Sequence, residues 1–170
     1  MKKCLTIMFV LIISISLFGE NKTRLKYQDY IKFKNGLGLS YSNMTGSGIS
    51  YYRQFGEKFQ IKTTNLFYYS KKDDYTRTIV FIGSEVNNFF YSSDYFRSYF
   101  LTGFAYSIDE DTKEDEFDRK IHFGIGLGLE IFSTEHIRLN IDIGYDYDKS
   151  IEYNNEKLGL GVGVAARFVY

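Results

Sequence analysis

Apolar and polar residues alternate strictly over long stretches of this chain. From Ile121 to Ile131 every odd position is apolar, while the even positions hold His122, three glycines and Glu130. A period of two predicts a β-strand, because successive side chains of a strand point to opposite faces. The three glycines also disfavour a helix here, at about 1 kcal/mol each.

Seven further segments show the same period and bring the predicted number of strands to eight. Clear alternation runs through 31–41, 137–147 and 158–170, and less regular alternation through 47–55, 59–69, 76–84 and 96–107. Many of these segments exceed the usual strand length of about five to six residues. They suit a tilted strand that crosses a bilayer, which needs ~9–11 residues. The chain has no proline, so no ladder hydrogen bond is lost to one.

The connectors between the predicted strands alternate in character. The short ones are 55–58 and 133–136, and the longer, charged ones are 70–75, 108–120 and 148–157. Short turns on one side and longer polar loops on the other are typical of an outer-membrane barrel. With an even number of strands, both termini would lie on the short-turn side. The connector 85–95 is long for that side.

The residues that alternate with the apolar ones show which face meets lipid. In the best-patterned strands they are mainly glycines, namely Gly124, Gly126, Gly128, Gly159, Gly161 and Gly163. A row of glycines weakens the exposed face of a soluble sheet. Inside an eight-stranded barrel, where the lumen only just holds side chains, glycines make room for larger groups. We therefore expect the apolar residues to face lipid and the glycines to line the lumen.

Charged residues share the glycine-bearing face. They are Glu130, Arg138, Asp142 and Arg167. Buried charges must be paired, because an unpaired one costs several kcal/mol. A hairpin centred on Thr134 would place Glu130 opposite Arg138. We expect a lumen charge network that closes the barrel, and the alternative is a gated or selective pore, although eight strands rarely leave a channel.

The first nineteen residues have the features of a signal peptide. Lys2 and Lys3 precede an apolar stretch, 5–18, which would span roughly 21 Å as a helix. A bilayer core of about 30 Å needs a longer segment, so this one has the size of a signal-peptide core. We predict a signal peptide at 1–19 and one barrel domain at 20–170. Cys4 would be removed with the signal.

The chain ends in Gly-Val-Gly-Val-Ala-Ala-Arg-Phe-Val-Tyr. This ending resembles the last strand of bacterial outer-membrane barrels, which finish with two aromatic residues two positions apart. The whole mature chain resembles the eight-stranded group that includes the OmpA transmembrane domain, OmpX and the opacity-type proteins. The resemblance implies an all-β, up-and-down transmembrane β-barrel in contact with outer-membrane lipids. It also implies that the barrel-assembly machinery reads Phe168 and Tyr170 during biogenesis.

Composition excludes several other classes. The chain has 170 residues, enough for one domain or one small barrel. Its 21 basic and 21 acidic residues balance, which argues against a nucleic-acid partner bound through a basic face. An aromatic content of 19% is too high for a disordered chain, and a single cysteine excludes a disulfide framework.

One predicted loop is strongly acidic. Its acidic residues are Asp109, Glu110, Asp111, Glu114, Asp115, Glu116 and Asp118. They lack the spacing and the central glycine of an EF-hand. We interpret them as a solvated extracellular loop, or as one that a divalent cation bridges to phosphorylated lipid headgroups.

The two histidines, His122 and His136, lie on different elements and lack metal-ligand spacing. Neither belongs to the His-x-Ser pair that an eight-stranded lipid A deacylase would need. We therefore expect no catalytic residues, no metal and no cofactor. The expected role is structural, or a surface interaction in which the charged loops bind an extracellular ligand or host component. The alternatives are a narrow channel for small solutes and a secreted soluble β-barrel or sandwich that binds a ligand.

Overall fold

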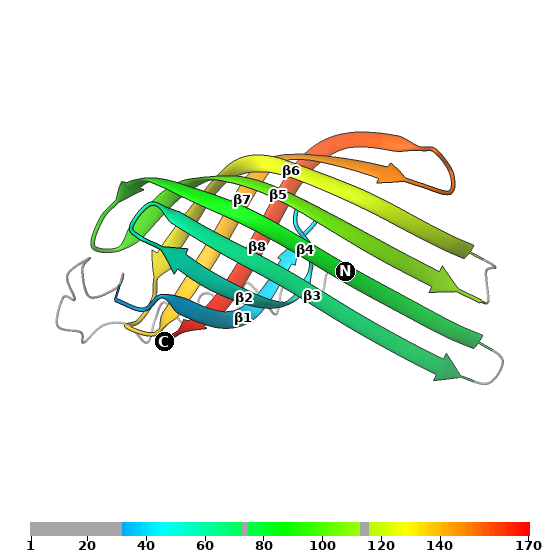
Figure 1. Ribbon diagram of the computed structural model, residues 1–170, viewed down its shortest axis with the longest axis horizontal. Coiled ribbons are helices and arrows are strands. Elements are labelled where there is room, and N and C mark those ends of the chain that lie inside the picture. Colours follow the sequence, from blue (N-terminus) through cyan, green and yellow to red (C-terminus); the bar gives the residue numbers. More distant parts are fainter. Residues whose placement is uncertain (1–31, 73–74, 113–115) are drawn as a thin grey trace.

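Backbone pairing joins eight antiparallel strands in chain order and closes the last onto the first (Figure 1). The computed structural model describes residues 32–72, 75–112 and 116–170, so the predicted signal peptide at 1–19 lies outside the described residues. The strands are β1 (Asn35–Ser42), β2 (Gly48–Phe55), β3 (Phe59–Lys72), β4 (Tyr75–Ser92), β5 (Phe96–Asp111), β6 (Glu116–Phe132), β7 (Ile137–Ser150) and β8 (Glu156–Val169). The predicted eight-stranded antiparallel barrel is confirmed. The part of the chain that the structure describes contains no helix that could span a membrane.

The apolar residues of the alternating strands point outward. Ile125, Leu127, Ile141 and Val162 are 54%, 47%, 47% and 46% exposed, respectively. The positions between them face the lumen, and most of those are buried. A soluble sandwich would gather these four side chains in its interior, so the arrangement is not that of a soluble sandwich.

Strand pairing extends well into the predicted loops. Asp109 pairs with Asp118 across β5 and β6, so most of the expected loop 108–120 is a hairpin. The expected loop 70–75 is likewise largely strand, and so are residues 148–150 and 156–157 of the expected loop 148–157. Strand β4 continues to Ser92 through most of the connector expected at 85–95. These expectations were wrong because backbone pairing does not depend on the side chains. Where both faces of a sheet are polar, the ladder continues although the alternation of apolar residues stops.

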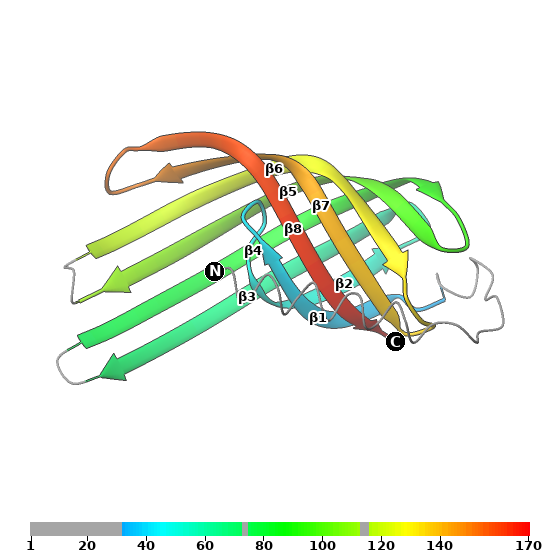
Figure 2. The same cartoon turned by 180° about the vertical axis from the view of Figure 1, so that it is seen from behind.

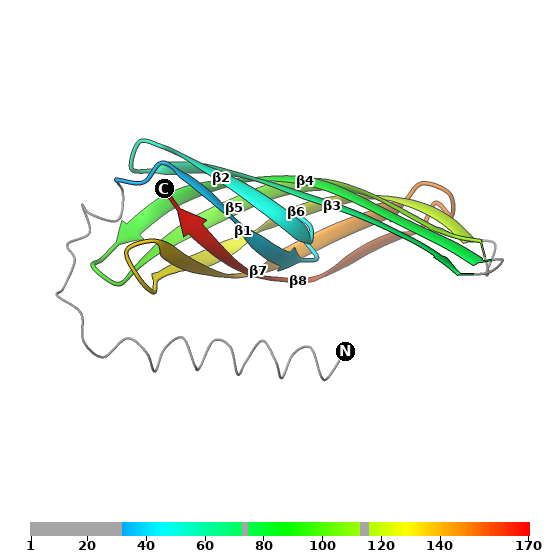
Figure 3. The same cartoon turned by 90° about the horizontal axis from the view of Figure 1, so that it is seen from below.

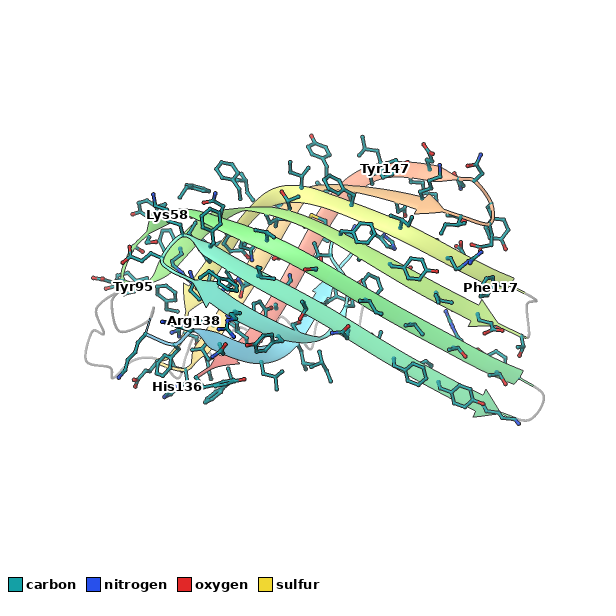
Figure 4. The ribbon with its side chains drawn as sticks, viewed as in Figure 1. Lys58, Tyr95, Phe117, His136, Arg138 and Tyr147 are labelled. Carbon is teal, nitrogen blue, oxygen red and sulfur yellow. The ribbon has the colours of Figure 1, made fainter. Side chains whose placement is uncertain are left out.

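The two ends of the barrel differ. Lys58, Tyr95 and His136 mark the short turns at the left of Figure 4, and we name this the short-turn end. The first residues of β1 and the last of β8 lie there, joined by a hydrogen bond from the Tyr170 amide to the Asn35 carbonyl oxygen at 3.0 Å. At the other end, which we name the mouth, Phe117 and Tyr147 lie on strands that extend far beyond β1 and β2.

The barrel wall has a step, because β1 and β2 have 8 residues each and β4 has 18. The β1–β2 hairpin covers only the half near the short-turn end (Figures 2 and 3). Asn43 extends the seam past the end of β1: its Oδ1 accepts the Val162 amide at 2.7 Å and its Nδ2 donates to the Leu160 carbonyl at 3.1 Å. Towards the mouth, 66–72 of β3 and 156–160 of β8 pair with a strand on one side only, as far as the described residues extend.

Candidate functional site in the barrel lumen

The loop between β1 and β2 folds into the lumen and fills it. Met44 and Thr45 are both 0% exposed, and we name these two residues the plug. Ser42 Oγ accepts the amides of Met44 and Thr45 at 3.1 and 3.2 Å. Thr45 Oγ1 donates to Glu85 Oε2 on β4 at 2.7 Å, which ties the plug to the opposite wall. The plug was not predicted because Met44 and Thr45 fall between two predicted strands, 31–41 and 47–55, where no alternation indicates a side-chain direction.

Four glycines of the wall make the space that the plug occupies. A Cβ at these positions would lie 2.0 to 2.5 Å from an atom of Thr45 (Gly83 and Gly103) or of Met44 (Gly124 and Gly161). Real Cβ atoms do not approach other heavy atoms so closely, so a larger residue would require the plug or the wall to move. The glycines therefore leave room for a loop that lies 38 or more residues earlier in the chain and folds inward.

The other glycines predicted to line the lumen have different neighbours. A Cβ on Gly128 would lie 2.1 Å from the Tyr99 ring, and one on Gly163 would lie 3.0 Å from Asp142 Oδ2. Gly126 faces the backbone of β7 at close range. Gly159 is exposed at the mouth, with no heavy atom within 4 Å of the position of a Cβ.

A buried ion pair lies beside the plug. Lys62 on β3 and Glu85 on β4 are direct cross-strand partners and form a salt bridge. Their side chains are almost completely buried. Glu85 thus joins the plug hydroxyl of Thr45 to an ammonium group. This pair was not predicted, because Glu85 falls in the expected connector 85–95, where a side chain has no predicted direction.

Glu130 lies at the centre of a second buried cluster. It pairs with Arg97, its cross-strand neighbour on β5, and with Arg167 on β8. The predicted pairing of Glu130 opposite Arg138 is wrong, since Asn140 lies opposite Glu130 and Phe132 lies opposite Arg138.

The turn explains the shift in register. Thr134 Oγ1 accepts the amides of His136 and Ile137 at 3.2 and 3.0 Å, so four residues, 133–136, separate β6 from β7. The hairpin is centred on residue 135, one residue later than expected.

The two remaining predicted lumen charges, Arg138 and Asp142, are buried and contact groups other than Glu130. Arg138 donates to the Thr134 carbonyl oxygen at 2.6 Å, and its guanidinium lies 5.0 Å from the centre of the Phe132 ring, at the short-turn end. Asp142 accepts the Tyr99 hydroxyl at 2.5 Å. The four predicted charges therefore all face the lumen, but their contacts with their neighbours form separate clusters.

Two cavities lie at opposite ends of the packed region. The one near the short-turn end has about 10 Å³, lined by Tyr52 and Arg97 among others, which is room for about one water molecule. The one at the mouth has about 130 Å³ and is lined by Asp118, Lys120 and Asp148 among others. The plug and the two ion-pair clusters fill the lumen between them.

The predicted acidic loop does not form an isolated acidic surface. Asp109 pairs with Arg77 at 2.9 Å, and Asp118 pairs with Lys120 at 2.8 Å. The hydrogen bond to Asp118 raises the pKa of the Lys120 ammonium above its usual value. Glu110 and Asp111 are on β5, Glu116 begins β6, and Glu114 and Asp115 lie outside the described residues. The mouth therefore carries charges of both signs.

Phe168 and Tyr170 are exposed near the short-turn end. The Phe168 ring stacks on His136, with 5.2 Å between ring centres. His136 in turn contacts Phe33, with 4.7 Å between ring centres. The proposed assembly residues thus lie on the outer surface next to the β8–β1 seam.

No protein-family model and no curated protein matches this chain. Among solved structures, the N-terminal barrel domain of Pseudomonas aeruginosa OprF is similar with a TM-score of 0.54 and 15% identity, over 81% of this chain and 96% of that one. The Yersinia pestis attachment invasion locus protein Ail, in complex with the heparin analogue sucrose octasulfate, gives 0.50 and 13%, over 81% and 97%. Neisserial surface protein A gives 0.49 and 16%, over 81% and 95%. At this identity the comparison concerns the fold, and the chain has the fold of the small eight-stranded outer-membrane β-barrels.

Proposed function

We propose that this protein is a non-conducting barrel of a bacterial outer membrane, with a structural or surface-interaction role at its mouth. The observation that carries the proposal is the combination of an apolar outer face with a lumen filled by the plug. A membrane barrel needs an apolar outer face in order to lie in lipid. A filled lumen is expected of a barrel that does not transport solutes.

The height of the apolar face supports a membrane location. Outward residues of β7 remain apolar or aromatic from Ile137 to Tyr147. Eleven residues at ~3.3 Å each, tilted by about 40°, span roughly 25 Å along the barrel axis, the height of the apolar band of an outer-membrane barrel. Tyr145 and Tyr147 at one end of the band, and Phe168 and Tyr170 at the other, fit the aromatic girdles at the two interfaces.

The buried contacts support a closed lumen in which the titratable groups have a structural role. Glu85 binds Lys62 and Thr45, and Glu130 binds Arg97 and Arg167. These titratable groups hold the barrel walls to one another and to the plug. Because they are engaged in this way, we assign no catalytic role to them.

The mouth is the surface that such a barrel would present outside the cell. The strands that form the mouth carry salt bridges between Arg77 and Asp109 and between Lys149 and Glu156. As far as the described residues extend, the edges of β3 and β8 that pair on one side only carry Lys71 and Lys157, which discourages the addition of another strand. A surface with both signs of charge suits an extracellular ligand or a host component. The similar barrel Ail was solved in complex with the heparin analogue sucrose octasulfate, which supports the proposal of a polar ligand.

Planar-bilayer recording tests the closed lumen. The purified protein should insert without conductance steps, under conditions in which a known porin conducts. Reproducible steps would favour the narrow-channel alternative, for which the charged lumen lining is the supporting observation. Cell fractionation tests the location, since recovery in the aqueous soluble fraction would contradict a membrane barrel.

A further inference from the structure

Three metal-ligating side chains meet inside the mouth. The register of β6 with β7 places His122 opposite Asp148 and Gly124 opposite Asp146. Residues two apart on a strand share a face, so His122, Asp146 and Asp148 all point into the lumen. One donor atom from each lies within 4.8 Å of the other two. His122 lies 24 positions before Asp146 and 26 before Asp148 in the sequence, so only the strand register brings it to the two carboxylates.

Two of the three side chains have a buried atom that could bind a metal and that has no hydrogen-bond partner. Asp146 is 8% exposed, and its Oδ1 has no hydrogen bond within the described structure. The Nδ1 of His122 is also buried without a hydrogen-bond partner. A buried polar atom without a partner is costly, and in native proteins such atoms are few. Two of them in one cluster indicate a bound group that satisfies both.

The surroundings hold the His122 ring in an orientation suited to binding. Its Nε2 lies 3.2 Å from Ser107 Oγ, and Phe81 stacks on it with 5.7 Å between ring centres. When Nε2 carries the proton and donates to Ser107, Nδ1 keeps a free lone pair. Metal-binding histidines use the second ring nitrogen in this way.

We propose that His122, Asp146 and Asp148 bind one divalent transition-metal cation, with Zn²⁺ preferred over Mn²⁺. One imidazole nitrogen with carboxylate oxygens is a mixed donor set that suits these ions, and zinc binds more tightly in the general order of affinities. Bonds of about 2.1 Å in a tetrahedral site put the ligand atoms roughly 3.4 Å apart. These atoms lie within 4.8 Å of one another in the structure, so the side chains close by at most about 1.4 Å on binding.

The neighbourhood allows the ion to enter and to keep a water ligand. Gly159 pairs with Asp146 across β7 and β8, and the space beside it is open. The mouth cavity of about 130 Å³ reaches Asp148 from outside. Of the nearby cations, Lys120 is held by Asp118 at 2.8 Å, and Lys157 pairs with Asp148 in the strand register.

Isothermal titration of the refolded, EDTA-treated full chain in detergent with ZnCl₂ tests the site. We expect one zinc ion per chain, and at least tenfold weaker binding in His122→Gln and in Asp146→Asn. The chain's only other histidine, His136, lies at the short-turn end, so His136→Gln is the matched control and should bind as the wild type does. Zinc binding that survives in His122→Gln, or that is lost in His136→Gln, would overturn the proposal.

A second measurement does not depend on how well the variants fold. The folded wild-type chain should shift the imidazole ¹⁵N resonances of His122 upon zinc addition and leave those of His136 unchanged. Mn²⁺ should broaden the same His122 signals at higher concentration. The absence of any response at His122 in the folded wild type would refute the site.

Discussion

The fit between the plug and the glycines of the wall can be tested with one methyl group. In Gly83→Ala the added Cβ would lie 2.0 Å from the Thr45 carbonyl oxygen, a backbone atom that cannot rotate away. On its other side the Cβ of Ala105 is 3.2 Å away. Because the wall is held by strand pairing on both sides, we expect the plug to leave the lumen.

The expected cost follows from what the plug loses. Exposure of the Met44 side chain costs about 1.5–3 kcal/mol. Loss of the charge-assisted hydrogen bond from Thr45 to Glu85 costs about 1.5–3 kcal/mol. The two released residues regain about 1–2 kcal/mol of backbone entropy each, which offsets part of this. The free energy of unfolding should therefore fall by about 1–3 kcal/mol.

Two assays follow the plug. Urea unfolding in detergent micelles reports the stability, and mass spectrometry after mild peroxide treatment reports the accessibility of the Met44 sulfur. Met44 should resist oxidation in the wild type and react in Gly83→Ala. Gly159→Ala is the matched control, because it adds the same methyl group to an inward strand position where no heavy atom lies within 4 Å. It should leave Met44 protected and the stability equal or slightly higher.

The reasoning would be refuted if Gly83→Ala matched Gly159→Ala in both assays. Such a result would mean that the wall yields to the methyl group while the plug stays in place. The glycines would then not be needed to seat the plug.

The remaining predictions concern the lumen ions and the seam. Glu130→Ala removes the carboxylate shared by two buried arginines and should lower the free energy of unfolding by about 3–5 kcal/mol, as measured by urea unfolding. Glu156→Ala, at the exposed mouth, is the control. Equal urea midpoints for the two variants would contradict the expectation. Deletion of Tyr170 removes two backbone hydrogen bonds to Asn35 and should cost about 1–3 kcal/mol. The heat-modifiable band on a detergent gel should therefore weaken more than it does in Tyr153→Ala, and an unchanged band would show that the seam closes without them.

Part of the lumen could be predicted from local pattern alone. The position of Glu130 between apolar residues was enough to place it in the interior, because a strand turns successive side chains to opposite faces. Its partners could not be predicted in the same way. The turn after β6 is centred on residue 135 and not on Thr134, and this shift of one residue moved the cross-strand partner of Arg138 by two residues, from Glu130 to Phe132.

The sequence by itself determined that the chain forms long strands with one apolar face and one face of small or polar residues. The reason is that the period of two is a property of the strand backbone and repeats in every strand. Only the tertiary structure decided which inward groups meet. It brought Met44 to Gly161 and His122 to Asp146, contacts that depend on barrel closure, register and the path of one loop. These arise from pairing between distant strands, and no local pattern records them.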